Sequence, residues 1–109
     1  MIFVLDCADH DRFGEARKEF QKVVENKDMR RAAVLIFANK QDQKHAIKAT
    51  EVPAILGLDK MTDRAWFVQP SCASKGTGLD TGLNWLIENS GRTNKSNRRN
   101  RSNILLHMK

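Results

Sequence analysis

The chain has 109 residues, of which 40% are hydrophobic and 29% charged, and its formal net charge is +6. This length and composition suit one small domain with a modest core and exclude disorder throughout. The sequence shows no apolar run of transmembrane length and no secretory signal pattern. Its two cysteines, Cys7 and Cys72, lack the spacing of metal ligands, so we interpret both as reduced cytosolic thiols.

The net charge is concentrated at the C-terminal end. Residues 1–90 contain 13 Lys and Arg and 13 Asp and Glu, whereas residues 91–109 contain six basic residues and no acidic one. A stretch rich in Asn and Ser begins at Gly91. We therefore expect a folded domain over residues 1–90 and a basic, disordered tail over residues 91–109.

Three apolar runs predict β-strands, at Ile2–Asp6, Val34–Ala38 and Trp66–Gln69. The first is continuously apolar, which is typical of a strand covered on both faces. A helix is predicted between the first two strands, because apolar residues share one helical face there: Phe13, Ala16, Phe20, Val23 and Val24. Asp9 or Asp11 can cap this helix.

Two more helices are predicted further along the chain. Thr50 can cap a short one with Pro53 in its first turn and Gly57 at its end. The last spans Leu79–Glu88, with four residues expected to face inward: Leu79, Leu83, Leu86 and Ile87. The alternation β-α-β-α-β-α predicts an α/β fold with a parallel sheet and right-handed crossovers. Such sheets bind ligands beyond the carboxyl ends of their strands.

A polar tetrapeptide, Asn39-Lys40-Gln41-Asp42, directly follows the second predicted strand. Guanine presents two adjacent donors, N1–H and the N2 amino group, and an ionised Asp42 can accept both. Adenine has an acceptor at N1 and no amino group at C2, so it would leave Asp42 unpaired. Asn39 can donate to N7, and the stem of Lys40 can lie over the face of the base. The pattern predicts a guanine-recognition loop.

A second loop, Ser71-Cys72-Ala73-Ser74, follows the third predicted strand, and its backbone N–H groups can donate to guanine O6. Neither motif is specific alone, since a polar loop can match by accident. Their order, each after a strand, favours one guanine site that includes Cys72 and Ala73 besides Asn39, Lys40 and Asp42.

Other candidate residues have simpler interpretations. Asp6 and Asp9 could suggest a carboxylate pair, but strand-end placement and helix capping account for them. Trp66 and Trp85 suit core or interface packing better than stacking on a base. The three histidines share no ligand spacing and are interpreted as surface residues: His10, His45 and His107.

Together these segments resemble the carboxy-terminal half of an ADP-ribosylation factor (Arf) or Arf-like small GTPase. The resemblance covers residues 1 to about 90 and rests on four segments, Ile2–Arg12, Phe37–Asp42, Ser71–Ser74 and Gly76–Leu86. It implies a three-layer, P-loop-NTPase-like partial G domain whose ligand is GTP or GDP. It also implies the family's role in vesicle-mediated transport, in the cytoplasm and at Golgi or other endomembranes.

The sequence contains no G-x-x-x-x-G-K-[S/T] phosphate loop, which in such proteins holds the phosphates and Mg²⁺. Asp11-Arg12-Phe13-Gly14 spells D-x-x-G, but we reject it as a γ-phosphate motif because it falls where the first helix should begin. We therefore predict base contacts with GTP or GDP only, no catalytic or metal-binding residue in this chain, and no GTP hydrolysis by it alone. The start inside an apolar run is expected to reflect a truncation.

An alternative function is a non-catalytic interaction module whose basic tail, residues 91–109, binds an anionic membrane or a protein partner. A polybasic stretch gains roughly 1 kcal/mol per Lys or Arg near an anionic membrane, so a weak contact is expected. Nucleic acid fits less well, because the tail has no aromatic residue for stacking. The sequence leaves both classes open and identifies no effector or exchange factor.

Overall fold

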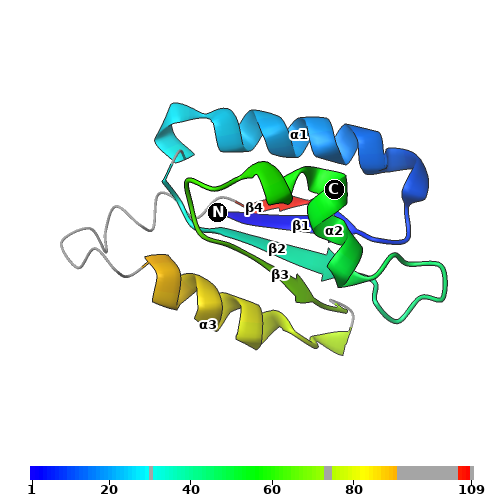
Figure 1. Ribbon diagram of the computed structural model, residues 1–109. Coiled ribbons are helices and arrows are strands. Elements are labelled where there is room, and N and C mark those ends of the chain that lie inside the picture. Colours follow the sequence, from blue (N-terminus) through cyan, green and yellow to red (C-terminus); the bar gives the residue numbers. More distant parts are fainter. Residues whose placement is uncertain (30, 73–74, 91–105, 109) are drawn as a thin grey trace.

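The computed structural model describes four stretches of the chain, residues 1–29, 31–72, 75–90 and 106–108. Among these residues a parallel sheet of four strands runs in the order β3-β2-β1-β4 (Figure 1). Its strands are Ile2–Asp6 (β1), Val34–Asn39 (β2), Trp66–Pro70 (β3) and Leu106–Met108 (β4). The three predicted strands are confirmed, with β2 and β3 each one residue longer at the carboxyl end.

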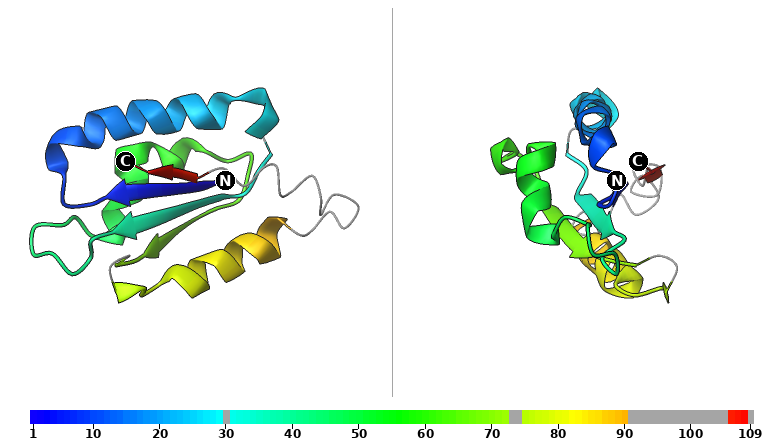
Figure 2. Two further views of the ribbon diagram at one scale, coloured as in Figure 1. Left: turned by 180° about the vertical axis from the view of Figure 1, so that it is seen from behind. Right: turned by 90° about the vertical axis from the view of Figure 1, so that its right-hand side faces the viewer.

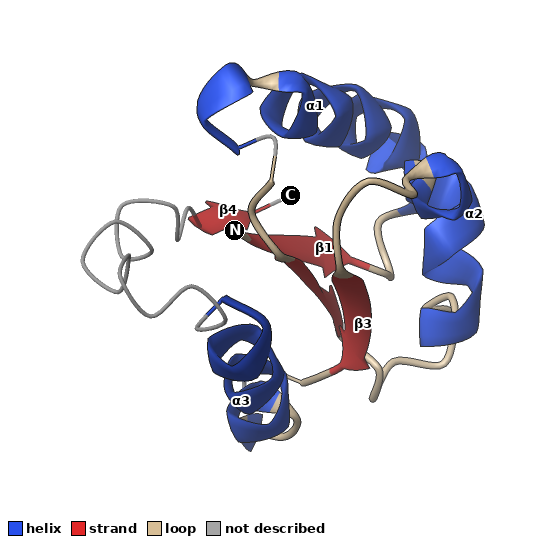
Figure 3. Cartoon of the chain, turned by 60° about the vertical axis from the view of Figure 1, so that its left-hand side comes forward, coloured by secondary structure: helices blue, strands red, loops and turns tan. Residues whose placement is uncertain are grey.

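Helices cover both faces of the sheet. The helices α1 (Phe13–Glu25) and α2 (Val52–Leu56) lie on one side, and α3 (Leu79–Ser90) lies on the other (Figures 2 and 3). Short 3₁₀ turns connect these elements, at His10–Arg12, Lys27–Met29, Ala49–Glu51 and Leu58–Lys60. The predicted three-layer α/β architecture is confirmed.

The two central strands are apolar on both sides because each side packs on helices. On the α1 and α2 side, Phe3 meets Phe20 edge to face, with ring centroids 5.1 Å apart. On the α3 side, Ile2 packs in a second cluster with Leu86. Trp85 stacks on Phe67 there at 5.5 Å, so its predicted packing role is confirmed.

The predicted side-chain caps of the helices are wrong. Asp9 precedes the first 3₁₀ turn without a capping hydrogen bond, Asp11 lies inside that turn, and Thr50 lies inside the turn before α2. In both places the 3₁₀ turn supplies backbone carbonyls instead, so Val52 N–H donates to the carbonyl of Ala49. The predicted end of α2 is confirmed, because Gly57 is left-handed with φ 79°.

The inward face of α3 differs from the prediction at two of its four residues. Leu86 is buried and Leu79 packs against the core, but Leu83 is 39% exposed and Ile87 is 67% exposed. The helix approaches the sheet through Gly82, where an added Cβ would lie 2.7 Å from the Phe37 ring. Positions 79, 82 and 86 therefore form the contact line, and Leu83 and Ile87 lie further round the helix.

The last strand was not expected. Leu106–Met108 pairs in parallel with Ile2–Val4, where the sequence predicted part of a disordered tail. The expectation of disorder for residues 91–105 and 109 lies outside the described residues. Within the described stretches, every helix is too short or too polar to cross a bilayer.

Candidate functional site

The two loops predicted to recognise guanine lie side by side at the carboxyl edge of the sheet. β2 ends at Asn39 and β3 ends at Pro70, and both strands run in the same direction. The loops are joined directly, because Gln41 N–H donates to the carbonyl of Ser71 at 3.2 Å. Parallel pairing thus brings together Asn39, Lys40, Asp42 and Cys72, while Ala73 lies outside the described residues.

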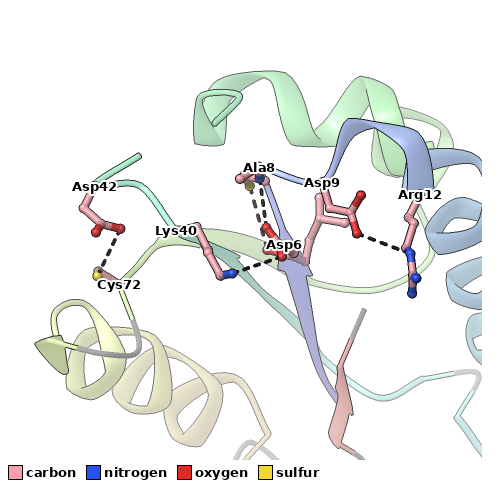
Figure 4. Close-up of polar contacts among 9 residues, drawn as sticks. Asp6, Ala8, Asp9, Arg12, Lys40, Asp42 and Cys72 are labelled. Carbon is pink, nitrogen blue, oxygen red and sulfur yellow. Dashed lines mark hydrogen bonds and ion pairs between the residues drawn. The ribbon is translucent and has the colours of Figure 1, made fainter. Parts of the chain in front are cut away.

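Lys40 forms a left-handed turn directly after β2. Its φ is 65°, a conformation that costs a non-glycine residue about 1–2 kcal/mol. The turn is closed by Gln43 N–H, which donates to the Lys40 carbonyl at 3.0 Å, and Gln41 Nε2 donates to the carbonyl of Ile47 at 3.0 Å. These contacts send the side chains of Lys40 and Asp42 in different directions (Figure 4).

Asp42 lies beside the second loop. Cys72 Sγ donates to Asp42 Oδ1 at 3.3 Å, and the thiol is buried while the carboxylate is exposed (Figure 4). An ionised carboxylate has about four acceptor positions, so one thiol leaves room for the two donors of a base. The contact therefore orients the carboxylate without using up its acceptor capacity.

Lys40 extends toward the end of β1. Its Nζ lies 3.4 Å from Asp6 Oδ2, while Asp6 Oδ1 accepts a hydrogen bond from Ala8 N–H at 2.9 Å. The predicted strand-end placement of Asp6 is confirmed, because Asp6 is the last residue of β1, and its carboxylate holds both the turn after β1 and the lysine. Sequence reasoning missed this contact, because it depends on the register of β1 and β2, in which Asp6 is the partner of Asn39. Asp9 does not pair with Asp6 but bridges to Arg12 at 3.4 Å.

A comparison with known protein families gives one match that covers most of the chain. The model of the ADP-ribosylation factor family matches residues 1–90. The chain belongs to the ADP-ribosylation factor family. A similar solved structure is the Arl6 BBS3 small GTPase from Trypanosoma brucei with bound nucleotide analogue GppNp, which is 37% identical with a TM-score of 0.74. The match covers 80% of this chain and 55% of that one, so this chain spans about half of that relative's length.

A cavity of about 390 Å³ adjoins the start of the first loop of this Arf-family domain. Its lining mixes both charge signs and comprises Val4, Asp6, Asp9, Arg12, Glu15, Asn39 and Lys40. A larger cavity, of about 660 Å³, lies between α1 and residues 57–64 and shares no lining residue with the two loops. The smaller cavity reaches the carboxyl edge of the sheet at Asn39 and Lys40, but its lining includes neither Asp42 nor Cys72.

Two further polar side chains near this edge, Cys7 and Ser71, are buried. Cys7 and Cys72 are not joined by a disulfide, and burial raises the pKa of the Cys7 thiol to about 11, so Cys7 is a neutral thiol at pH 7. The Ser71 hydroxyl is buried and has no hydrogen-bond partner among the described residues. Those residues also contain no group of three or more His, Cys, Asp or Glu side chains arranged to hold a metal.

Proposed function

We propose that this chain is the guanine-base-recognition part of an Arf-like GTPase and binds GTP or GDP through the base. The supporting observation is the placement of Asp42. It follows β2 at the carboxyl edge of the sheet and is held by Cys72 from the neighbouring loop. This is the edge at which open parallel sheets bind their ligands.

Each residue of the site has a distinct role in this proposal. Asp42 accepts the N1–H and N2 amino donors of guanine, and Asn39 donates to N7. The stem of Lys40 covers one face of the base, while the backbone N–H of Ala73 donates to O6. The Cys72 N–H, also expected to donate to O6, instead donates to the carbonyl of Thr77 at 3.3 Å, so Cys72 contributes through its thiol. We assign no residue of this chain to phosphate or Mg²⁺, because the sequence has no phosphate loop and the described residues offer no metal-binding set.

The wider role follows from the family. We propose that the chain acts in the cytoplasm or at endomembranes such as the Golgi, in the vesicle transport associated with Arf proteins. A separate contact with anionic membranes is proposed for residues 91–109 on their charge alone. Salt-sensitive pelleting with phosphatidylserine vesicles tests that contact, and pelleting that survives replacement of the basic residues between positions 92 and 101 by glutamine, which leaves β4 in place, would contradict it.

The test of base recognition compares the chain with its Asp42→Asn variant. The change replaces a double acceptor by one acceptor and one amino donor, and that donor faces the donors of guanine. The loss of a charge-assisted bidentate contact should cost about 2–5 kcal/mol, which lowers GDP affinity more than about tenfold. Affinity for XDP should rise, because xanthine has a carbonyl at C2 that suits the new donor.

Backbone amide NMR shifts suit the measurement, because they report weak binding of GDP, XDP and ADP by the isolated chain. Asp59→Asn is the matched control, since Asp59 is an exposed carboxylate in the turn after α2, outside both loops. It should bind the three nucleotides as the unchanged chain does. An Asp42→Asn variant that keeps the original preference for GDP would show that Asp42 does not read the base.

A further inference from the structure

We propose that Asp6 is a positioning residue of the guanine site, which holds Lys40 so that its stem forms one wall of the slot for the base. The inference rests on the proposed function, because it assigns a role in the same site. Asp6 belongs to β1 and to neither motif loop, so nothing in the N-K-x-D pattern itself includes it.

The carboxylate of Asp6 is fixed before it meets the lysine. Its Oδ1 accepts the Ala8 N–H at 2.9 Å, which leaves Oδ2 directed at Lys40 Nζ, 3.4 Å away (Figure 4). The position of Asp6 relative to the loop is set by the sheet, since Asp6 is the register partner of Asn39. The carboxylate of Asp6, which a backbone N–H holds in place, therefore lies at the start of the recognition loop, beside Asn39.

Lys40 is also the residue of this loop that needs such support. It is the non-glycine residue with positive φ among those the structure describes, so its backbone would otherwise favour other conformations. The carbonyl of Lys40 accepts the Gln43 N–H that closes the turn. Asp42 lies inside this turn, so a shift of the Lys40 backbone also shifts the backbone of Asp42. The ion pair with Asp6 favours the turn in which Lys40 reaches β1 and Asp42 reaches Cys72.

The effect should be local rather than global. The side chains of Lys40 and Asp6 are 44% and 31% exposed, and ion pairs at that exposure contribute little to overall stability. Removing the pair should therefore loosen the loop and weaken guanine binding while the melting temperature barely changes. A residue with a purely structural role would instead lower the melting temperature when it is replaced, with little effect on guanine binding.

Asp6→Asn separates these roles, because the amide oxygen can still accept the Ala8 N–H while the charge facing Lys40 is lost. We expect amide hydrogen exchange at Gln43 to accelerate about threefold to tenfold, and GDP affinity to fall by a similar factor with no change for ADP. Lys40→Met removes the same ion pair but keeps an apolar stem for the base. The double variant should lose no more GDP affinity than either single variant, because both changes break one contact.

Asp63→Asn is the matched control, since it breaks a carboxylate ion pair of equal length, 3.4 Å to Arg64, away from both loops. It should alter neither Gln43 exchange nor GDP binding. A chain that prefers GDP over ADP but is indifferent to Asp6→Asn would overturn the role of Asp6 alone. Additive losses in the double variant would also overturn it. A chain with no preference for GDP would overturn the proposed function and, with it, this role of Asp6.

Discussion

The thiol of Cys72 donates a hydrogen bond to the carboxylate of Asp42, with Sγ 3.3 Å from Oδ1. The two residues are 30 positions apart in the sequence and belong to different loops, one after β2 and one after β3. The contact therefore makes one structural unit of two segments that sequence motifs describe separately.

The first prediction concerns this contact. Cys72→Ala removes the donor and should lower GDP affinity about twofold to tenfold, the effect of a hydrogen bond worth about 0.5–1.5 kcal/mol. Cys72→Ser keeps a donor and should bind within about twofold of the unchanged chain. Amide NMR titration with GDP and ADP measures both. Equal losses in the two variants would mean that the volume of the side chain matters and the donor does not.

The second prediction uses two adjacent residues of α3 that differ in burial. Leu86 is 2% exposed and Ile87 is 67% exposed. Leu86→Ala should lower the free energy of unfolding by about 2–5 kcal/mol, whereas Ile87→Ala should change it by less than about 0.5 kcal/mol. Ile87→Ala should also reduce self-association, because it removes an exposed apolar side chain. Urea unfolding and light scattering provide the readouts, and similar losses at both positions would contradict the orientation of α3.

The third prediction tests the close approach of the β3 end to the start of α3. Gly78 has φ 83°, and a Cβ added there would lie 2.2 Å from the carbonyl oxygen of Pro70. Gly78→Ala should therefore destabilise the fold by about 2–4 kcal/mol, through backbone strain and overlap together. Gly14→Ala is the control, because Gly14 is in α1 and a Cβ added there would meet no atom of the rest of the protein within 4 Å, so it should stabilise by about 0.5–1 kcal/mol. An unchanged urea midpoint for Gly78→Ala would rule out this approach.

The fourth prediction concerns pH. Burial raises the pKa of the Cys7 thiol to about 11, the charge of Asp6 adds to the rise, and a hydrogen bond with Gln41 opposes it. The thiol of an unfolded chain ionises near pH 8.5, so above that pH the unfolded state loses a proton that the folded state keeps. The contribution of the Cys7 thiol to the free energy of unfolding is therefore fully present below about pH 8.5 and is lost as the pH rises through 11.

Urea unfolding between pH 8 and pH 11 measures this loss. A Cys7→Ala variant should show a smaller decrease over the same range, because it lacks the titrating group. Iodoacetamide at pH 8 should label Cys7 only after unfolding, since the folded thiol is neutral and buried. Rapid labelling of Cys7 in the folded chain, or identical pH profiles for the two proteins, would contradict the raised pKa.

Local pattern and chemistry were enough to predict much of this protein. The apolar run Ile2–Asp6 is β1, the apolar face of α1 is buried at Ala16, Phe20 and Val24, and Gly57 ends α2. The order of strands and helices also predicted a parallel sheet, and that topology alone brings the ends of β2 and β3 to one edge. These features depend on residues near one another in the sequence or on the hand and direction of the connections.

Contacts that depend on register and on the distance between layers required the tertiary structure. Asp6 reaches Lys40 because β1 and β2 align Asp6 with Asn39, and no local pattern specifies that alignment. The burial of Leu86 and the exposure of Ile87 follow from the close approach of Gly82 to Phe37. The sequence by itself determined the elements and the polar groups at their ends. The tertiary structure decided which of those groups meet, because partners distant in the chain come together only when whole strands and helices pack.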